Sequence, residues 1–376
     1  MTTLLPTPVR PTRGLLRDLE HPSQLFGNLG PNWYASIMGT GIVANAAATL
    51  PVHVPGLRAL ATVVWALAAL LLIALTAAWG VHWTRHPATA RSYADHPVLA
   101  QFWGAPAMAL LTVGAGTLLL GRDWIGLPAA LTVDTVLWIG GTLLGLVTSA
   151  WIPYKVITSH RVAPDAAFGG WLMPVVPPMV SAATGALLVP YAPAGQLRLT
   201  LLLTCYAMFG ISLFATVIIV GQIWQRLVHH GIGSAAMVPT LWIVLGPLGQ
   251  SVTAANLLGN AAPLTLPAPY GSAAQALALF YSLPTWGFAM MWLAIAAAVT
   301  VRTARAHLPF SLTWWSFTFP LGTVVTGTSG LALRTDAVLF RWAAVLGYVL
   351  LVAAWLIVAS RTARESARGR IFLPPR

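Results

Sequence analysis

The side chains that could carry redox or hydrolytic chemistry are few, and they lie at the edges of apolar segments. The chain of 376 residues contains nine histidines and one cysteine, Cys205. All nine histidines fall in expected tails, loops or segment ends, whereas a membrane haem protein needs axial ligands inside its helical bundle. Neither an HExxH motif nor a paired-carboxylate site occurs in the sequence. The sequence therefore predicts no metal and no cofactor, and it argues against a membrane enzyme or redox carrier.

Asp134 is the only acidic residue that lies well inside an apolar segment. A carboxylate at membrane depth is a candidate functional residue by default. Two interpretations are open. In the first, which we favour, Asp134 pairs with Arg122 or Arg341 or accepts hydrogen bonds; in the second, it couples transport to protons.

Four prolines recur at nearly equal intervals, and each lies in an apolar segment long enough to cross a membrane. Successive members are 71, 70 and 73 residues apart: Pro106, Pro177, Pro247 and Pro320. One further step toward the N-terminus leads to a run of small residues: Gly39, Thr40 and Gly41. A proline inside a helix removes a hydrogen bond and bends the axis. Bends in register indicate one structural unit copied along the chain, and we expect these seven residues to line a central constriction.

The composition places these segments in a membrane. Hydrophobic residues make up 57% of the chain and charged residues 7%, with a mean hydropathy of +0.77, whereas soluble domains carry about 25% charged residues. The sequence predicts an all-α integral membrane domain at 31–360, between a polar N-terminal tail at 1–30 and a basic C-terminal tail at 361–376. Its ten predicted spans are 31–51, 57–83, 99–120, 128–151, 168–190, 198–224, 237–259, 273–300, 310–330 and 337–360.

The distribution of positive charge predicts the topology. The net charge of +12 comes from residues that flank apolar segments, so it does not indicate nucleic-acid binding. With an even number of spans and both ends in the cytoplasm, fifteen of the twenty lysines and arginines fall on the inner side. The other five are expected outside: Arg58, Arg122, Arg198, Arg334 and Arg341.

The ten spans group into five copies of one hairpin. Odd-numbered spans begin at about 31, 99, 168, 237 and 310, and they carry the prolines and most of the small polar residues. Broken or polar helices are tolerated at membrane depth where they face protein or water. We therefore expect an inner five-helix ring around a pore, with the second helix of each hairpin outside. The odd spans contain no aspartate or glutamate, which argues against a ring of carboxylates that binds cations.

Two motifs resemble the tellurite-resistance/dicarboxylate transporter family, which includes slow anion channels of guard cells, sulfite efflux pumps and malate permeases. They are PNWYASIMGTGIV at 31–43 and WWSFTFPLG at 314–322. The resemblance covers about residues 28–360. It implies five hairpins around a pore and a homotrimer with one pore per subunit. It also implies a gate at the phenylalanine before the ninth-span proline, here Phe319, with Phe317 as the alternative.

The predicted function is transport of small anions across the cell membrane. An apolar ring such as that of Phe319 can close a narrow passage by dewetting, without any charge. The resemblance suggests C4-dicarboxylates such as malate, sulfite, tellurite-type oxyanions, or chloride and nitrate. A membrane enzyme or redox carrier and a non-conducting scaffold are the alternatives.

Overall fold

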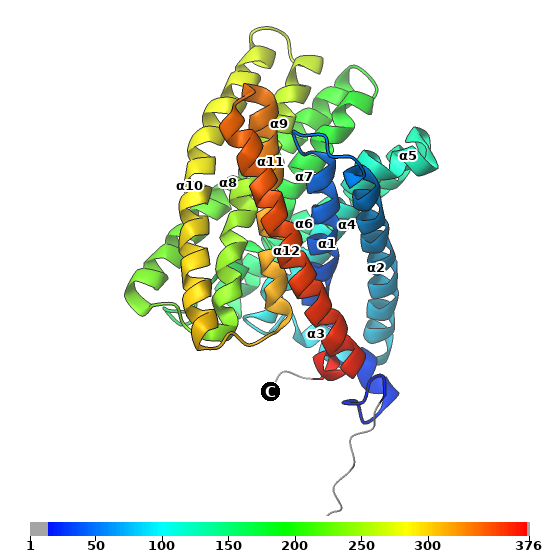
Figure 1. The fold of residues 1–376 in the computed structure, drawn as a ribbon, viewed down its shortest axis with the longest axis vertical. Coiled ribbons are helices and arrows are strands. Elements are labelled where there is room, and N and C mark those ends of the chain that lie inside the picture. The colour runs from blue at the N-terminus through cyan, green and yellow to red at the C-terminus, as the bar shows by residue number, and fades with distance from the viewer. Residues whose placement is uncertain (1–13, 374–376) are drawn as a thin grey trace, which may run out of the picture.

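A computed structural model describes residues 14–373, and these residues form helices without any strand. The start of the predicted N-terminal tail, with Arg10 and Arg13, and the last three residues, with Arg376, lie outside this range. The two described ends lie at the same end of the molecule (Figure 1). They are joined directly, because the Leu16 N–H donates to the Ala367 carbonyl at 2.7 Å.

Seven helical segments are long and apolar enough to cross a membrane, so the fold is that of a multi-span helical membrane protein. They are Leu57–Arg85, Leu99–Ile125, Leu127–Thr158, Gln196–His230, Ala235–Leu264, Tyr270–Ala306 and Val338–Arg368. The other three predicted spans contain the shorter helices α1 (Tyr34–Ala48), α7 (Pro177–Leu188) and α11 (Phe319–Thr335). The count of ten membrane crossings therefore stays a prediction.

Five helices contact one another in cyclic order. Helix α1 contacts α4 (Gly104–Gly116), α4 contacts α7, α7 contacts α9 (Leu245–Ala261), α9 contacts α11, and α11 contacts α1. Nearly every residue of these helices is buried. Their glycines, alanines, serines and threonines allow close helix approach, which is the packing that membrane helices favour.

Five longer helices pack around this group. They are α2 (Leu57–Arg85), α6 (Leu127–Thr158), α8 (Gln196–His230), α10 (Tyr270–Ala306) and α12 (Val338–Arg368). Each packs against two neighbours of the cyclic set, and each exposes leucine, valine, isoleucine or phenylalanine on its other side. Exposed apolar side chains on long helices are typical of a surface that faces lipid.

Short helical segments connect the long ones, mostly at the ends of the bundle. Two are α-helices, α3 (Pro87–Ser92) and α5 (Arg122–Ile125), and η4 (Thr117–Gly121) is a π-helical turn. The rest are 3₁₀ segments: η1 (Pro22–Phe26), η2 (Pro31–Trp33), η3 (Leu99–Trp103), η5 (Gly169–Leu172), η6 (Val189–Tyr191), η7 (Ala235–Val244), η8 (Ala262–Leu264), η9 (Leu312–Phe317) and η10 (Arg370–Phe372).

The four registered prolines lie within the first three residues of α-helices, and the bends predicted at these positions stay a prediction. Pro177 is the first residue of α7, Pro320 the second of α11, and Pro106 and Pro247 the third of α4 and α9. The first N–H groups of a helix have no partner within it, so a proline there loses no hydrogen bond. The shared register therefore marks the points where the α-helices begin.

Candidate functional site

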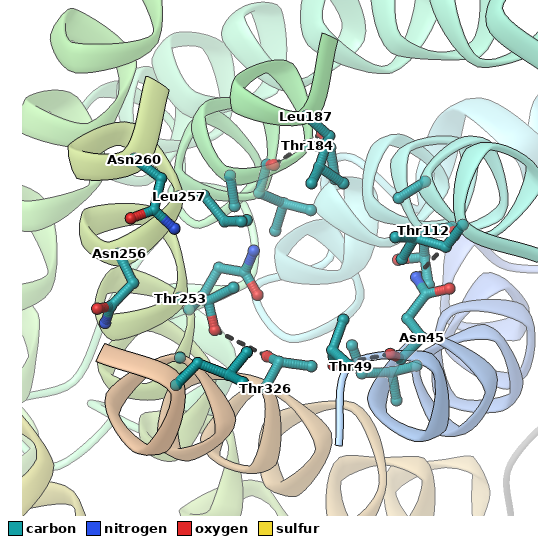
Figure 2. Close-up of a pocket in the computed structure, with 18 of the residues that line it drawn as sticks. Asn45, Thr49, Thr112, Thr184, Leu187, Thr253, Asn256, Leu257, Asn260 and Thr326 are labelled. Atoms are coloured by element: carbon teal, nitrogen blue, oxygen red, sulfur yellow. Dashed lines mark hydrogen bonds between the residues drawn. The ribbon is translucent and has the colours of Figure 1, made fainter. Parts of the chain in front are cut away.

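A cavity of about 340 Å³ lies among the five helices of the cyclic set (Figure 2). Each helix contributes residues spaced by about three or four positions, so each presents one face to the cavity. The lining residues are Ile42, Asn45 and Thr49 of α1; Thr112, Ala115 and Leu119 of α4 and η4; Val180, Ala183, Thr184 and Leu187 of α7; Gln250, Thr253, Asn256, Leu257 and Asn260 of α9; and Phe319, Thr326, Gly330, Leu333 and Arg334 of α11.

Among the described residues, the cavity lining mixes apolar with uncharged polar side chains and carries a single charge. Nine uncharged polar side chains line the cavity beside one arginine, Arg334, and no aspartate or glutamate is among the described lining residues. A carboxylate ring of the kind that cation channels use is therefore absent from this part of the structure. The lining suits a solute that carries negative charge.

Most of the threonine hydroxyls are occupied by their own helices. Thr112 donates to the Met108 carbonyl at 2.7 Å, and Thr184 donates to the Val180 carbonyl at 2.9 Å. Such bonds to the preceding turn leave the oxygen as an acceptor only. Thr112 and Thr184 therefore have no hydroxyl proton to offer a solute in this conformation.

The amides provide the remaining uncharged donors. Asn256 gives its Nδ2 to the Val252 carbonyl at 2.9 Å and to Ser282 Oγ at 3.1 Å, so its amide is engaged. Within residues 14–373, no side-chain hydrogen bond is formed by the Gln250 amide, and none is donated by Asn260 Nδ2. These two groups are left to face a solute in the cavity.

This chain is similar to known proteins over nearly its whole length. The family model described as voltage-dependent anion channel matches residues 28–363. The chain belongs to the voltage-dependent anion channel family. The family and the relatives below are transporters or channels, not enzymes, and the resemblance drawn from the two sequence motifs is confirmed.

Two of the relatives are named for the solute that they transport. A sulfite efflux pump of Arthroderma otae is 26% identical, over 92% of this chain and 93% of the relative. A malic acid transport protein of Schizosaccharomyces pombe is 20% identical, over 89% of this chain and 78% of the relative. An uncharacterized transporter of Methanocaldococcus jannaschii is 26% identical, over 92% of this chain and 97% of the relative.

The two candidate gate residues, Phe319 and Phe317, lie in different surroundings. Phe319 lines the cavity and is only 2% exposed. Phe317 does not line it and instead packs edge-on against Trp242 and Trp314, with ring centroids 5.3 and 5.8 Å apart. Of the two phenylalanines, the structure therefore places only Phe319 in the cavity lining.

The other predicted pore residues do not contribute to this cavity. Pro247 lines a second, more apolar cavity of about 320 Å³ bounded by α7, α8, α9 and α10. Six line neither of the two: Gly39, Thr40, Gly41, Pro106, Pro177 and Pro320. Thr40, for example, is held in a helix contact, because it accepts a hydrogen bond from Trp355 Nε1 at 3.1 Å. Their place along a conduction path stays a prediction.

Asp134 has none of the partners that the sequence suggested. Its side chain is fully buried, and neither carboxyl oxygen has a hydrogen-bond partner among the described residues. Arg122 lies near Asp123, and Arg341 pairs with Asp336, so the predicted ion pair is wrong. The carboxyl packs against α4 at Gly114, where a Cβ would lie 2.6 Å from Asp134 Oδ1.

Replacing Asp134 by leucine is expected to stabilise the protein. Leucine has a similar branched shape, and a buried polar group without a partner costs about 1–3 kcal/mol, so we expect a gain of that order. Thermal unfolding in detergent measures it, with Asp134→Asn as the control that keeps the polarity. Anion uptake should be unchanged in both variants; its loss in a stable leucine variant would instead support the proton-coupling interpretation.

Proposed function

We propose that this protein transports small anions across the cell membrane through the cavity between its five buried helices. The observation that carries the proposal is the lining: five helices each turn one face to a single space whose described lining residues include one arginine and no carboxylate. A positive field in a low-dielectric passage concentrates anions and repels cations.

The proposed architecture is ten membrane helices arranged as five hairpins. The cyclic contacts of α1, α4, α7, α9 and α11 support an inner five-helix ring, and the packing of each longer helix against two of them supports an outer set. The predicted charge asymmetry supports a cytoplasmic location for both ends. The homotrimer is proposed from the family resemblance alone.

Phe319 is the proposed gate. It begins α11 and is separated from Arg334, near the other end of the same helix, by roughly 22 Å at about 1.5 Å per residue. Its ring would close the end of the cavity nearer to the cytoplasm. A buried benzyl side chain there excludes water, and an ion cannot pass a dry constriction without losing its hydration.

The proposed substrates are sulfite or C4-dicarboxylates such as malate. This choice rests on the names of the relatives, a sulfite efflux pump and a malic acid transport protein. Tellurite-type oxyanions and chloride or nitrate are further anions that the lining could accept, because amide and guanidinium donors suit any of them.

Uptake by liposomes that contain the purified full-length protein tests this function. Labelled sulfite, malate and chloride are compared side by side with empty liposomes, under an imposed membrane potential. We expect uptake of at least one anion above the empty control. Absence of uptake for all three at every potential, in correctly folded protein, would contradict the proposal and favour a non-conducting scaffold.

A further inference from the structure

Among residues 14–373, Arg334 is the only charged residue in the cavity lining, and it has no acidic partner. None of the six ion pairs formed by residues 14–373 includes it. The carboxylate nearest in sequence, Asp336, is engaged by Arg341 at 2.8 Å. The Arg334 side chain is half-buried near the C-terminal end of α11. That end of α11 lies at the end of the molecule opposite the two chain ends (Figure 1).

Two asparagines of α9 hold the guanidinium in place. Nε donates to Asn256 Oδ1 at 2.7 Å, and Nη2 donates to the Asn256 carbonyl at 3.0 Å and to Asn260 Oδ1 at 2.8 Å. Gly259 leaves the space for this contact, because a Cβ there would lie 3.3 Å from Nη2. Neutral acceptors position the group without cancelling its charge, which a carboxylate partner would do.

Donor groups remain for an anion at this point. The guanidinium has five N–H donors; the three bonds above use three, and Nη1 gives a fourth to the Gln275 carbonyl at 3.4 Å. One Nη1 N–H is therefore left. Beside it, Asn260 accepts from Arg334 through its oxygen, which turns its amide nitrogen toward the cavity in Figure 2.

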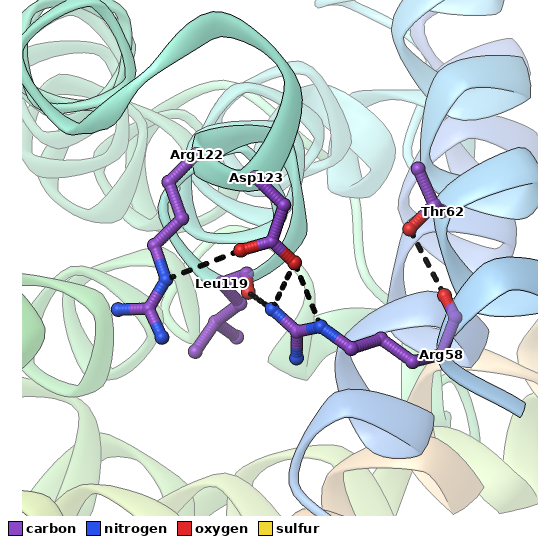
Figure 3. Close-up of polar contacts among 5 residues, drawn as sticks. All are labelled: Arg58, Thr62, Leu119, Arg122 and Asp123. Atoms are coloured by element: carbon purple, nitrogen blue, oxygen red, sulfur yellow. Dashed lines mark hydrogen bonds and ion pairs between the residues drawn. The ribbon is translucent and has the colours of Figure 1, made fainter. Parts of the chain in front are cut away.

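A second positive group lies near the opposite wall of the cavity. Arg58 donates to the carbonyl of Leu119, a lining residue, at 2.9 Å, and it binds Asp123 at 2.6 Å (Figure 3). Arg122 lies 3.9 Å from the same carboxylate. Two arginines around one aspartate leave a net positive charge, which adds to the field of Arg334.

We propose that Arg334, positioned by Asn256 and Asn260, is the anion-capture residue of the cavity and sets its preference for anions over cations. The inference rests on the proposed transport function. The site would take a small oxyanion or carboxylate, which meets one guanidinium N–H and the Asn260 amide. Arg334 would act on the anion mostly through long-range electrostatic attraction, because four of its five guanidinium donors already bind protein.

Arg334→Gln in liposomes tests the proposal, with Arg341→Gln as the matched control. Arg341 is an arginine of α12, is paired with Asp336, and does not line the cavity. We expect Arg334→Gln to raise the KM for sulfite or malate roughly tenfold or more and to shift the reversal potential toward cation permeability. Arg341→Gln should keep both values, and Arg334→Lys should restore part of the selectivity.

The variant Asn260→Asp tests the role of the positive charge of Arg334 without removing the arginine. The new carboxylate keeps an acceptor for Arg334 and neutralises it, so this variant should fold and lose anion preference as Arg334→Gln does. The inference would be overturned if Asn260→Asp and folded Arg334→Gln both kept the selectivity and the KM of the wild type. The proposed anion transport would not be affected by that result. Wild-type liposomes that transport no anion would instead overturn the proposed function itself.

Discussion

Replacing Phe319 by alanine is expected to raise anion flux by roughly tenfold or more, because each 1.4 kcal/mol removed from a barrier is worth about a factor of ten. The benzyl ring is 2% exposed and lines the cavity at the beginning of α11. Alanine would leave room for water at the proposed constriction, so an anion would keep more of its hydration as it passes. Current or uptake per reconstituted protein measures the change.

Phe317→Ala is the matched control for the gate. The two phenylalanines are two residues apart, but Phe317 packs against Trp242 and Trp314 away from the cavity lining. We expect its truncation to lower stability by about 3–5 kcal/mol, as for other buried phenylalanines, and to leave flux per folded molecule unchanged. Equal flux in Phe319→Ala and the wild type, at equal protein density, would contradict the gate.

Replacing Gly249 by alanine is expected to destabilise the bundle by about 1–3 kcal/mol, the usual effect of overpacking a tight core. A Cβ on Gly249 would lie 2.4 Å from the Val324 nitrogen and 2.5 Å from the Thr323 carbonyl carbon. These are backbone atoms of α11 that cannot turn aside as a flexible side chain does. Helices α9 and α11 would have to separate, which would also strain the 2.7 Å hydrogen bond between Thr253 and Thr326 in the cavity.

Gly246→Ala is the control for this packing prediction. Gly246 lies three residues earlier on the same helix, and a Cβ there would meet its nearest atoms, on Pro320, at 3.9 Å, an ordinary contact. Thermal unfolding in detergent should therefore give a lower midpoint for Gly249→Ala than for Gly246→Ala. Equal midpoints for the two variants would contradict the prediction, because they would mean that α9 and α11 can separate without any loss in the free energy of unfolding.

The residues that face the cavity illustrate the limit of prediction from the sequence. The sequence singled out Phe319 through the WWSFTFPLG motif, and the structure places its ring in the lining. Arg334 was counted only as an outer charge, although it lies fifteen residues farther along the same helix and on the cavity side. Helical spacing from Phe319 through Thr326 and Gly330 leads to it, but spacing cannot show which face of α11 meets a cavity.

The spacing of residues along the chain could not predict the hydrogen-bond partners of polar side chains either. Asp134 was expected to pair with an arginine, yet both candidate arginines lie near other aspartates and its carboxyl packs against Gly114. Thr112 and Thr184 line the cavity, yet each gives its hydroxyl proton to a carbonyl of its own helix. Which neighbour satisfies a polar group depends on distances of a few tenths of an ångström, which follow from packing.

The sequence by itself determined that this is a helical membrane protein, the family to which it belongs, and the register of its repeated units. Those properties follow from local composition and from order along the chain: apolar runs partition into lipid, and prolines at equal intervals mark equivalent places. Only the tertiary structure decided that the registered prolines begin α-helices, that the described lining of the cavity contains one arginine without an acidic partner, and that Asn256 and Asn260 hold it. These depend on which residues of different helices meet, and no pattern within a single helix specifies its neighbours.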